Sequence, residues 1–438
     1  MARINNKAFT RNTKLNFKML MGTILDFERL TLKKKLKKIL KKTKYKNVAY
    51  SNMNNLKYID KSTLCKGRKK IKPMGIKILN DDWIINSYTF KNSKPEFALY
   101  KNKYILSCID GTTLEIENTI ENRRTFGSAY GGGNTKRLAR AGASMLYDPL
   151  NKKIIDVEMG KYPANEREMF KQHIRHAKEI LPLDNNIQLL VISDRGYFGM
   201  DMMIYCLEEN VDFVFRLQKN IFKTDFENIH NNDEIVELDL IKKLRNLEKN
   251  DRKELKVKIE KLETTKAKVR LTKVTLDTGE IEYLLSSIPT TDVPYSEMKD
   301  LYFKRWSIET TYDFLKNTLN IEKFSGITKD IILQEFYAHA LLSNIAYDLE
   351  LEAQGLVNSR AKRKSLKWKY QVNRNEMIGT ISEYFLDILY TDDDDEREKI
   401  IDNVIEEISR NIEAVRPNRS FERKKLDKKG NKYNNRNR

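Results

Sequence analysis

The chain has 438 residues, and 82 lysines and arginines against 62 aspartates and glutamates give it a formal net charge of +20 and a pI of about 9.4. Such a charge favours a polyanionic partner, with nucleic acid ahead of an anionic membrane surface. Three widely spaced cysteines and four histidines argue against a disulfide framework or a zinc site, so carboxylates must carry any chemistry.

Residues 1–98 are predicted to form a helical, basic region that binds DNA. Residues 31–46 place leucine and isoleucine on one face and lysine on the others, the pattern of an amphipathic helix. Residues 60–71 begin with N-cap residues and end with basic ones, and Pro73 is interpreted as the stop signal. A solvated surface helix has the same pattern, but two in succession in a cationic chain favour DNA contact.

Residues 99–218 are predicted to form the first part of an α/β core with a mixed sheet. Short apolar runs bounded by turn residues indicate strands, and longer segments with helical periodicity indicate helices. The predicted strands are 104–109, 143–147, 154–161, 188–193 and 212–217, and the predicted helices are 165–181 and 201–209.

Residues 219–292 interrupt this pattern and are predicted to form a β-containing insertion. Residues 234–238 are a weaker strand prediction. Residues 269–276 and 281–287 flank the sequence Asp-Thr-Gly-Glu and predict a β-hairpin.

The rest of the chain is predicted to be helical, apart from its end. The predicted parts are a long helix from Ser296 and a helix at 331–351 in the second part of the core (293–352), a helix at 377–390 and a last helix after an acidic run in a C-terminal helical region (353–416), and a basic, disordered tail (417–438).

Four polar residues of the helix that starts near Ser296 share one stripe: Tyr302, Arg305, Glu309 and Lys316. At roughly 100° per residue they fall within an arc of about 60°. Bulky apolar residues border this polar stripe on both sides. An ion pair between Arg305 and Glu309 on a solvated face is the simple alternative, but such a face would not be enclosed by apolar neighbours.

Two aspartates follow buried apolar runs, Asp110 in C-I-D-G-T and Asp194 in S-D-R-G-Y. Taken alone, each aspartate is equally typical of an ordinary turn at the end of a strand. Together with Glu309 they supply three carboxylates, the ligands that Mg²⁺ or Mn²⁺ prefers. Two such ions about 3.5–4 Å apart stabilise the attacking and leaving oxygens of a phosphoryl transfer, and Arg305 and Lys316 would grip phosphates beside them. Separations of 84 and 115 residues mean that only the fold can bring the acids together.

The polar stripe, with the spacing Y-x2-R-x3-E-x6-K, resembles the signature of the IS4 group of bacterial insertion-sequence transposases. The sequences C-I-D-G-T and S-D-R-G-Y resemble the surroundings of that group's first and second catalytic aspartates. The resemblance extends from about residue 104 to residue 326, and a fainter one covers residues 15–80, where the family has a helical region that binds the element's ends.

This resemblance implies an RNase H-like core of the DDE type, with Asp110, Asp194 and Glu309 as catalytic metal ligands. It implies two Mg²⁺ ions, for which Mn²⁺ can substitute. Arg305 and Lys316 would hold DNA phosphates, with Tyr302 in support. The family's reaction is hydrolysis at the transposon ends to give a 3′-OH, which attacks target DNA. The implied partners are double-stranded DNA, both terminal repeats and target, and a second copy in a dimeric synaptic complex. No residue here could be matched to the base-flipping apparatus of relatives that form a DNA hairpin.

Four further cations are expected near the DNA: Arg195, beside Asp194, and Lys136, Arg137 and Arg140, which follow a glycine run at 131–133. An ordinary surface loop explains the last three equally well, and the glycine run lacks the spacing of a nucleotide-binding loop. The remaining motif-like residues are interpreted as structural: the acids Asp156, Glu158, Glu166 and Glu168, and the helix-surface histidines His173 and His176.

Three readings remain open for function: a transposase, a Mg²⁺-dependent nuclease that cuts without joining, and a DNA-binding protein with a vestigial site. A membrane-surface protein is a distant fourth, because the basic residues are spread over several segments. The sequence has no apolar run of signal-peptide or transmembrane length, so we expect no membrane partner and a cytoplasmic, nucleoid-associated bacterial protein.

Overall fold

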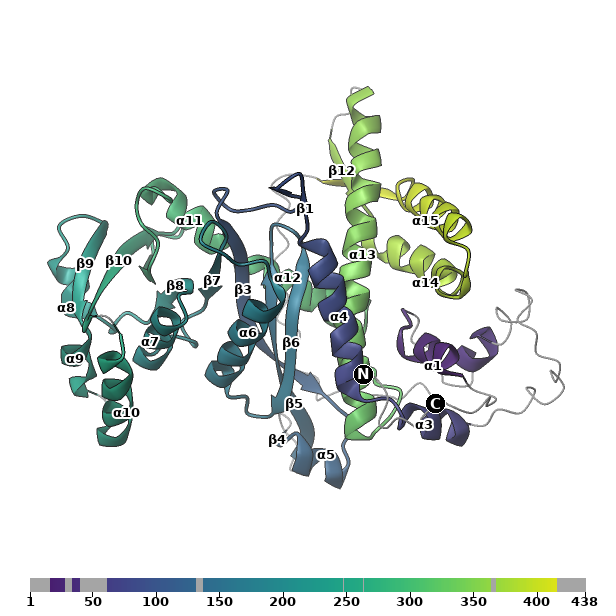
Figure 1. The fold of residues 1–438 in the computed structure, drawn as a ribbon, viewed down its shortest axis with the longest axis horizontal. Coiled ribbons are helices and arrows are strands. Elements are labelled where there is room, and N and C mark those ends of the chain that lie inside the picture. The colour runs from purple at the N-terminus through teal and green to yellow at the C-terminus, as the bar shows by residue number, and fades with distance from the viewer. Residues whose placement is uncertain are drawn as a thin grey trace.

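The computed structural model describes residues 16–27, 34–39, 61–130, 137–246, 248–262, 264–363 and 368–415 (Figure 1). Several predictions fall on other residues and therefore lie outside the described part of the chain. These are Lys136, the glycine run at 131–133, the tail at 417–438 and most of the amphipathic helix at 31–46.

Five strands form the centre of the molecule in the order β6-β5-β3-β7-β8. β3, β7 and β8 are parallel to one another, whereas β5 runs antiparallel to both β3 and β6. This mixed sheet is the RNase H-like arrangement, so the predicted fold class is confirmed. The strands are β3 (Tyr104–Glu115), β5 (Arg137–Asp148), β6 (Lys153–Lys161), β7 (Gln188–Ser193) and β8 (Asp212–Leu217).

The segment predicted as an insertion continues this sheet and forms no separate sheet of its own. β11 (Ile281–Ser286) pairs antiparallel with β8, and β10 (Lys266–Thr275) and β9 (Asp233–Asp239) follow outward. Gly279, with φ +84°, closes the predicted hairpin, a conformation that residues with a side chain rarely adopt. With the short β4 (Ser128–Tyr130) beside β5, the described sheet has nine strands.

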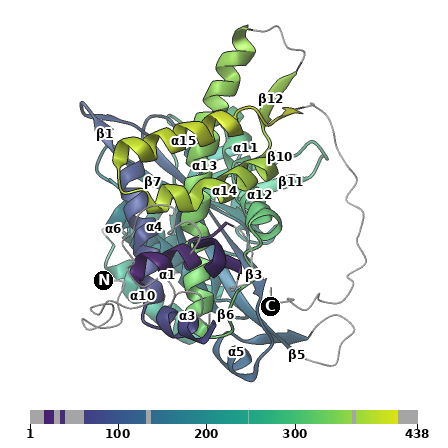
Figure 2. The ribbon, with the colours of Figure 1, turned by 90° about the vertical axis from the view of Figure 1, so that its right-hand side faces the viewer.

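Alternating side chains of the strands divide the interior between the two faces of the sheet. Ile105 and Ile109 of β3 belong to one buried cluster with α6 (Glu166–Ile180) and α7 (Met200–Glu208). Leu106 and Cys108 belong to another with α12 (Trp306–Asp313) and α13 (Lys329–Arg363). Figures 1 and 2 show the sheet between these helical layers. The first half of β3, residues 104–109, is therefore completely buried between the two layers, which fixes the position of Asp110 directly after it.

The N-terminal and C-terminal helices pack around α13. α4 (Pro73–Ser87) lies along α13, and α14 (Arg374–Tyr390) and α15 (Asp394–Ile408) lie on its other side (Figure 2). Pro73 was predicted as a stop signal, but it begins α4 at a position where its missing N–H costs nothing. The other N-terminal elements are α1 (Phe17–Ile24), a helical turn at 34–39, α3 (Lys61–Arg68), β1 (Phe90–Lys91) and β2 (Lys94–Pro95).

The helix predicted from Ser296 is interrupted twice. α11 (Tyr295–Phe303) ends in a tightened turn, where Arg305 and Ile308 donate to carbonyls three residues back, and α12 then begins. After α12 the chain widens into a π-helical segment, η3 (Phe314–Thr318), with Leu319 N–H bonded to the Phe314 carbonyl. Both changes of pitch occur within the polar stripe, so its residues are not related by one regular helix.

Short elements complete the described chain. They are α5 (Ile120–Thr125), α8 (Lys223–Asn228), α9 (Leu240–Lys243), η2 (Leu244–Asn246), α10 (Lys249–Glu260), and the two-stranded pair β12 (Lys369–Val372) and β13 (Ile412–Val415). In the whole described part of the chain, no helix is both long enough and apolar enough to cross a bilayer.

Candidate active site

Asp110 and Asp194 lie on neighbouring parallel strands at the same level of the sheet. Ile109 of β3 is in register with Ser193, the last residue of β7, so the two aspartates are the next residues on each strand. Asp110 was predicted at a strand end, but β3 continues to Glu115. What ends at Asp110 is the fully buried part of the strand. The sheet therefore brings these two carboxylates together.

Glu309 approaches from α12, which packs across β3. Tyr312 of that helix donates a hydrogen bond from its hydroxyl to the Asp110 carbonyl at 2.8 Å. Further along, the Lys316 Nζ donates to Thr112 Oγ1 at 2.6 Å and to the Thr113 carbonyl at 3.2 Å. These bonds hold the helix against the strand segment that carries Asp110.

Arg305 is the central cation of the site. Its side chain is only 6% exposed, and its Nη2 donates to Glu309 Oε1 at 3.0 Å. Burial alone would lower the pKa of Arg305, but Tyr302, Asp194 and Asp110 raise it above its ordinary value. The ion pair between Arg305 and Glu309, considered above as the simple alternative, is therefore present. Its arginine is buried and does not lie on a solvated face.

All three predicted carboxylates interact at Asp110. Burial raises the pKa of Asp110 to about 6, opposed by the Gly111 N–H and by Arg305. Glu309 and Asp194 raise it further, because each adds negative charge nearby. The charges of three acids that are far apart in sequence therefore influence one another in the fold, and Arg305 influences Asp110 as well.

The donor set suits a hard divalent ion, since it consists of carboxylate oxygens. Asp194 Oδ1 is buried without a hydrogen bond, and Arg216 Nη1 lies 3.6 Å from it. In the described part of the chain, however, no three acidic, histidine or cysteine side chains are grouped closely enough to hold a metal as they stand. Glu309 is paired with Arg305 and is not grouped with the two aspartates.

The remaining predicted DNA-contacting residues lie in different environments. Tyr302 is 2% exposed and packs near the Arg305 guanidinium, 5.9 Å from the ring centre, so it offers no surface to DNA here. Arg195 is exposed beside Asp194. Lys136 lies outside the described residues.

Two arginines of β5 were also predicted to lie near DNA. Arg137 is exposed and lies over the ring of Tyr130, 5.1 Å from its centre. Arg140 is partly buried, and its Nη2 lies 3.5 Å from Glu115 Oε1. Both belong to the half of β5 that extends beyond the level of Asp110, because Arg140 pairs with Glu115 and Asp110 with Met145.

One histidine prediction is wrong. His173 was expected on the helix surface, but it is completely buried and its Nδ1 lies 2.6 Å from Asp156 Oδ2. The i,i+3 spacing of His173 and His176 did not indicate this burial. His173 lies on the face of α6 that also buries Met169, Phe170, Ile174 and Ala177. Asp156 and Glu158, interpreted as structural, both pair with Lys77 of α4.

Glu166, interpreted as structural, has its carboxylate near two glycines of the candidate motifs. A Cβ added to Gly111 would lie 2.8 Å from Glu166 Oε1, and one added to Gly196 would lie 3.5 Å from Oε2. These two glycines belong to the motifs C-I-D-G-T and S-D-R-G-Y, and their lack of a side chain leaves room for the Glu166 carboxylate.

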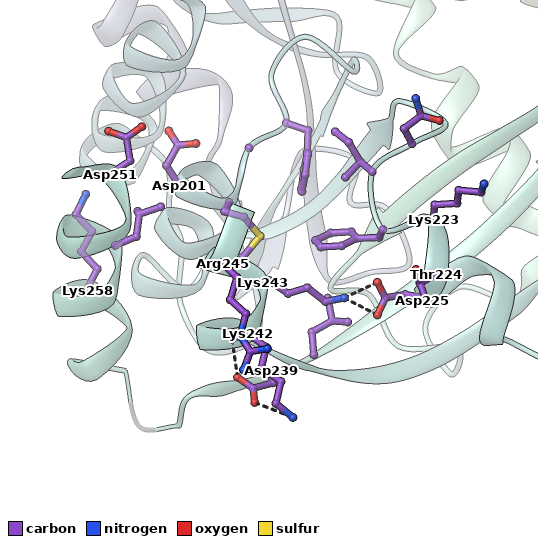
Figure 3. A pocket seen from close by; sticks show the side chains of 18 of the residues that line it. Asp201, Lys223, Thr224, Asp225, Asp239, Lys242, Lys243, Arg245, Asp251 and Lys258 are labelled. Atoms are coloured by element: carbon purple, nitrogen blue, oxygen red, sulfur yellow. Dashed lines mark hydrogen bonds and ion pairs between the residues drawn. The ribbon is translucent and has the colours of Figure 1, made fainter. Parts of the chain in front are cut away.

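A separate hollow of about 1030 Å³ lies between α7 and the α8–α10 segment (Figure 3). Cations and anions alternate in its lining, and several are paired, including Lys243 with Asp225 and Lys242 with Asp239. This neutralised lining contains none of the residues predicted from the sequence motifs.

An RNase H-like sheet with acids from two adjacent strands and from a packed helix has the architecture of the DDE class of DNA-processing proteins. Residues 101–345, more than half of the sequence, match the family model described as the transposase DDE domain. The chain therefore belongs to the transposase DDE domain family.

Among solved structures, the cryo-EM structure of a piggyBac transposase synaptic complex with hairpin DNA is similar to this chain. The TM-score is 0.40 at 10% identity, over 89% of this chain and 74% of that one. No curated protein matches the sequence.

Proposed function

We propose that this chain is a transposase that binds the terminal repeats of its own insertion sequence, cleaves the DNA at those ends and joins the 3′-OH ends to target DNA. Membership of the transposase DDE domain family supports the general activity. The spacing of the polar stripe supports assignment to the IS4 group.

The observation that carries this proposal is the convergence of Asp110, Asp194 and Glu309 around Arg305. Glu309 and Asp194 both raise the pKa of Asp110, and this influence supports the proposal that the three act at one site. Like charges gathered in a partly buried site cost free energy unless cations compensate them. A structural ion pair would need one acid for one arginine, and this site has three.

The chemistry proposed is phosphoryl transfer with two divalent ions, Mg²⁺ or its substitute Mn²⁺. Asp110, Asp194 and Glu309 would hold the ions, which activate the attacking oxygen and stabilise the leaving one. Arg305, buried among the acids, balances their charge before the ions bind. Lys316 and the exposed Arg195 and Arg137 are the cations we expect to contact DNA phosphates, with Arg140 next to them.

The division of labour along the chain is proposed on the same basis. Residues 1–98 would bind the terminal repeats, 99–218 and 293–352 would form the catalytic core, and 219–292 would extend it. Residues 353–416 would form the C-terminal helical region. Joining two DNA ends requires two active sites, so we propose a dimer in the synaptic complex.

The test is Glu309→Gln, assayed with Mg²⁺ and DNA that carries the element's terminal repeats. We expect cleavage to fall at least 1,000-fold, because one proposed ligand of the two divalent ions is lost. Binding of the DNA ends in a mobility-shift assay should change less than threefold. Glu322→Gln is a matched control, because Glu322 follows the same helix and its side chain accepts the Glu115 N–H. A fully active Glu309→Gln protein would remove Glu309 from the site.

The same assay separates the alternatives. Cleaved ends without joined products would indicate a nuclease that does not transfer strands. End binding with no cleavage by the unmodified protein would indicate a DNA-binding protein with a vestigial site.

A further inference from the structure

Tyr312 follows Glu309 by three residues and therefore lies on the same side of α12. Its ring packs against the apolar core between α12 and the sheet, where Leu114 of β3 and Met145 of β5 line the same small cavity. This packing needs only the aromatic ring, so the hydroxyl group must have another role.

The hydroxyl of Tyr312 is bonded to the backbone of the first candidate aspartate. It donates to the Asp110 carbonyl at 2.8 Å, and Ser144 Oγ of β5 donates to the same carbonyl at 3.2 Å. This carbonyl and the Gly111 N–H belong to one planar peptide group. The Gly111 N–H in turn donates to Asp110 Oδ1 at 2.9 Å. A continuous chain of hydrogen bonds therefore runs from the Tyr312 hydroxyl, through one peptide group, to the Asp110 carboxylate.

The planarity of the peptide group determines what this chain of hydrogen bonds can do. The C=O and the N–H of one peptide group turn only together, so a donor that fixes the carbonyl also fixes the N–H on the opposite side. Hydrogen bonds arranged in such a chain also polarise and strengthen one another. The same hydroxyl ties α12, which carries Glu309, to the strand segment that carries Asp110. Both the orientation of the Asp110 carboxylate and the placement of α12 beside it thus depend on Tyr312.

We propose that Tyr312 is a positioning residue of the candidate active site, whose hydroxyl holds the Asp110 carboxylate in its reactive orientation relative to Glu309. This assignment rests on the proposed function, because it requires that both carboxylates act in DNA cleavage. Tyr312 takes no part in the reaction and acts only through the Asp110–Gly111 peptide group. A hydroxyl that served only to satisfy a carbonyl of the interior would contribute to stability and not to the rate of cleavage.

Tyr312→Phe removes the hydroxyl and keeps the ring. We expect the rate of cleavage at saturating terminal-repeat DNA to fall about tenfold or more, since small displacements of reacting groups have large effects on rate. The affinity for the same DNA, measured in a mobility-shift assay, should change less than threefold. Ser144→Ala removes the longer bond to the same carbonyl and should lower the rate less than Tyr312→Phe does.

Tyr205→Phe is the matched control. The Tyr205 hydroxyl of α7 donates to the Lys171 carbonyl of α6 at 3.1 Å, so it also joins two elements through a backbone oxygen. Both variants should lower the Tm by similar amounts, because each loses one hydrogen bond of the same kind. Only Tyr312→Phe should slow cleavage.

A spectroscopic test of the hydrogen-bond chain is available because the dipeptide Asp-Gly occurs only once in the sequence, at 110–111. Protein labelled with ¹³C at the aspartate carbonyls and with ¹⁵N at the glycines gives a single correlation between a carbonyl carbon and the amide nitrogen bonded to it. In Tyr312→Phe this signal should move upfield in both dimensions, since its carbonyl loses a hydrogen bond. Tyr205→Phe should leave the signal in place. An unmoved signal in Tyr312→Phe would overturn the inference.

The cleavage assay separates failure of this inference from failure of the proposed function. If the unmodified protein cleaves terminal-repeat DNA and Tyr312→Phe cleaves it equally fast, the positioning role is overturned and the proposed function stands. If Tyr205→Phe slows cleavage as much as Tyr312→Phe, the loss follows from stability, and the positioning role is likewise overturned. If the unmodified protein does not cleave this DNA, the proposed function fails, and the role of Tyr312 fails with it.

Discussion

At the scale of single residues, Arg305 determines the electrostatics of the site. Its guanidinium is enclosed, pairs with Glu309 and lowers the pKa of Asp110 against the effect of burial. A cation in this position stabilises the empty site, because three carboxylates would otherwise repel one another. Under the proposed function, the same cation would compete with divalent ions for Glu309.

Arg305→Ala should therefore destabilise the metal-free protein by about 1–3 kcal/mol, since acids of the site lose their counter-charge. The measurement is urea denaturation in EDTA. Mg²⁺ should restore more stability to this variant than to the unmodified protein. Lys304→Ala, at the adjacent partly exposed position, is the control. Equal stability of Arg305→Ala and unmodified protein in EDTA would contradict this view.

The sequence identified Asp110, Asp194, Glu309 and Arg305 through their local contexts and spacing. It could not show that Arg305 is buried, because burial depends on how α12 packs on β3. It also could not show that the Glu166 carboxylate lies beside Gly111 and Gly196, because this depends on how α6 packs on the sheet. The contact between two elements that are distant in sequence depends on tertiary packing, and the local sequence at the start of α6 does not indicate it.

At the scale of elements, the π-helical segment η3 positions Lys316. The segment places its ammonium within hydrogen-bonding distance of Thr112 Oγ1 and the Thr113 carbonyl of β3. A lysine ammonium has three N–H donors, so one remains for a DNA phosphate after these two bonds. The change of pitch was not predictable from the spacing, because each residue of η3 is compatible with an ordinary α-helix.

We expect Lys316→Met to weaken binding of terminal-repeat DNA and to reduce the slope of log affinity against log salt by about 0.9, the value of one phosphate contact. The measurement is fluorescence anisotropy over a range of salt concentrations. Thr112→Val removes a partner of Lys316 but keeps its charge, so its salt slope should not change. An unaltered slope for Lys316→Met would place this lysine outside the DNA interface.

A buried polar cluster joins α4 to β6 and α6. His176 Nε2 lies 2.9 Å from Asp81 Oδ1 of α4, and Lys77 of α4 pairs with Asp156 of β6. Burial alone would lower the pKa of His176, but the hydrogen bond to Asp81 and the charge of Asp156 raise it above 6.5. The N-terminal helical region is thus attached to the core partly through a histidine whose pKa this cluster raises.

The sign of the resulting pH dependence follows from this raised pKa. The stability that protonated His176 contributes is complete below pH 6.5 and is lost as the pH rises through the higher pKa of the folded state. Urea denaturation at pH 6 and pH 9 should therefore show a larger loss for the unmodified protein than for His176→Asn. His230→Asn, at an exposed position, should follow the unmodified protein. Parallel pH profiles for the unmodified protein and His176→Asn would refute this coupling.

At the scale of the whole molecule, one sheet extends from β6 at one side to β9 at the other. The order of strands and helices in the core was predictable because each strand is a short apolar run. The pairing of β8 with β11 was not predictable, since the paired residues are 66 or more positions apart and such pairing leaves no local pattern. The segment at 219–292, predicted as a β-containing insertion, supplies β9, β10 and β11, and β11 covers the edge of β8.

This arrangement predicts that residues 219–286 cannot be replaced by a short Gly/Ser linker without loss of the core. β8 would lose the partner strand that pairs with Val214, Phe215, Arg216 and Leu217, and a bare apolar edge promotes aggregation. We expect the shortened protein to be insoluble or to lack a cooperative thermal transition, measured by size-exclusion chromatography and circular dichroism. Replacing only α10, which adds no strand to the sheet, should preserve a cooperative transition at lower temperature, because only Leu255 and Ile259 leave the interior. A soluble shortened protein with the original Tm would mean that the sheet of the core ends at β8 and that this segment folds as an independent insertion.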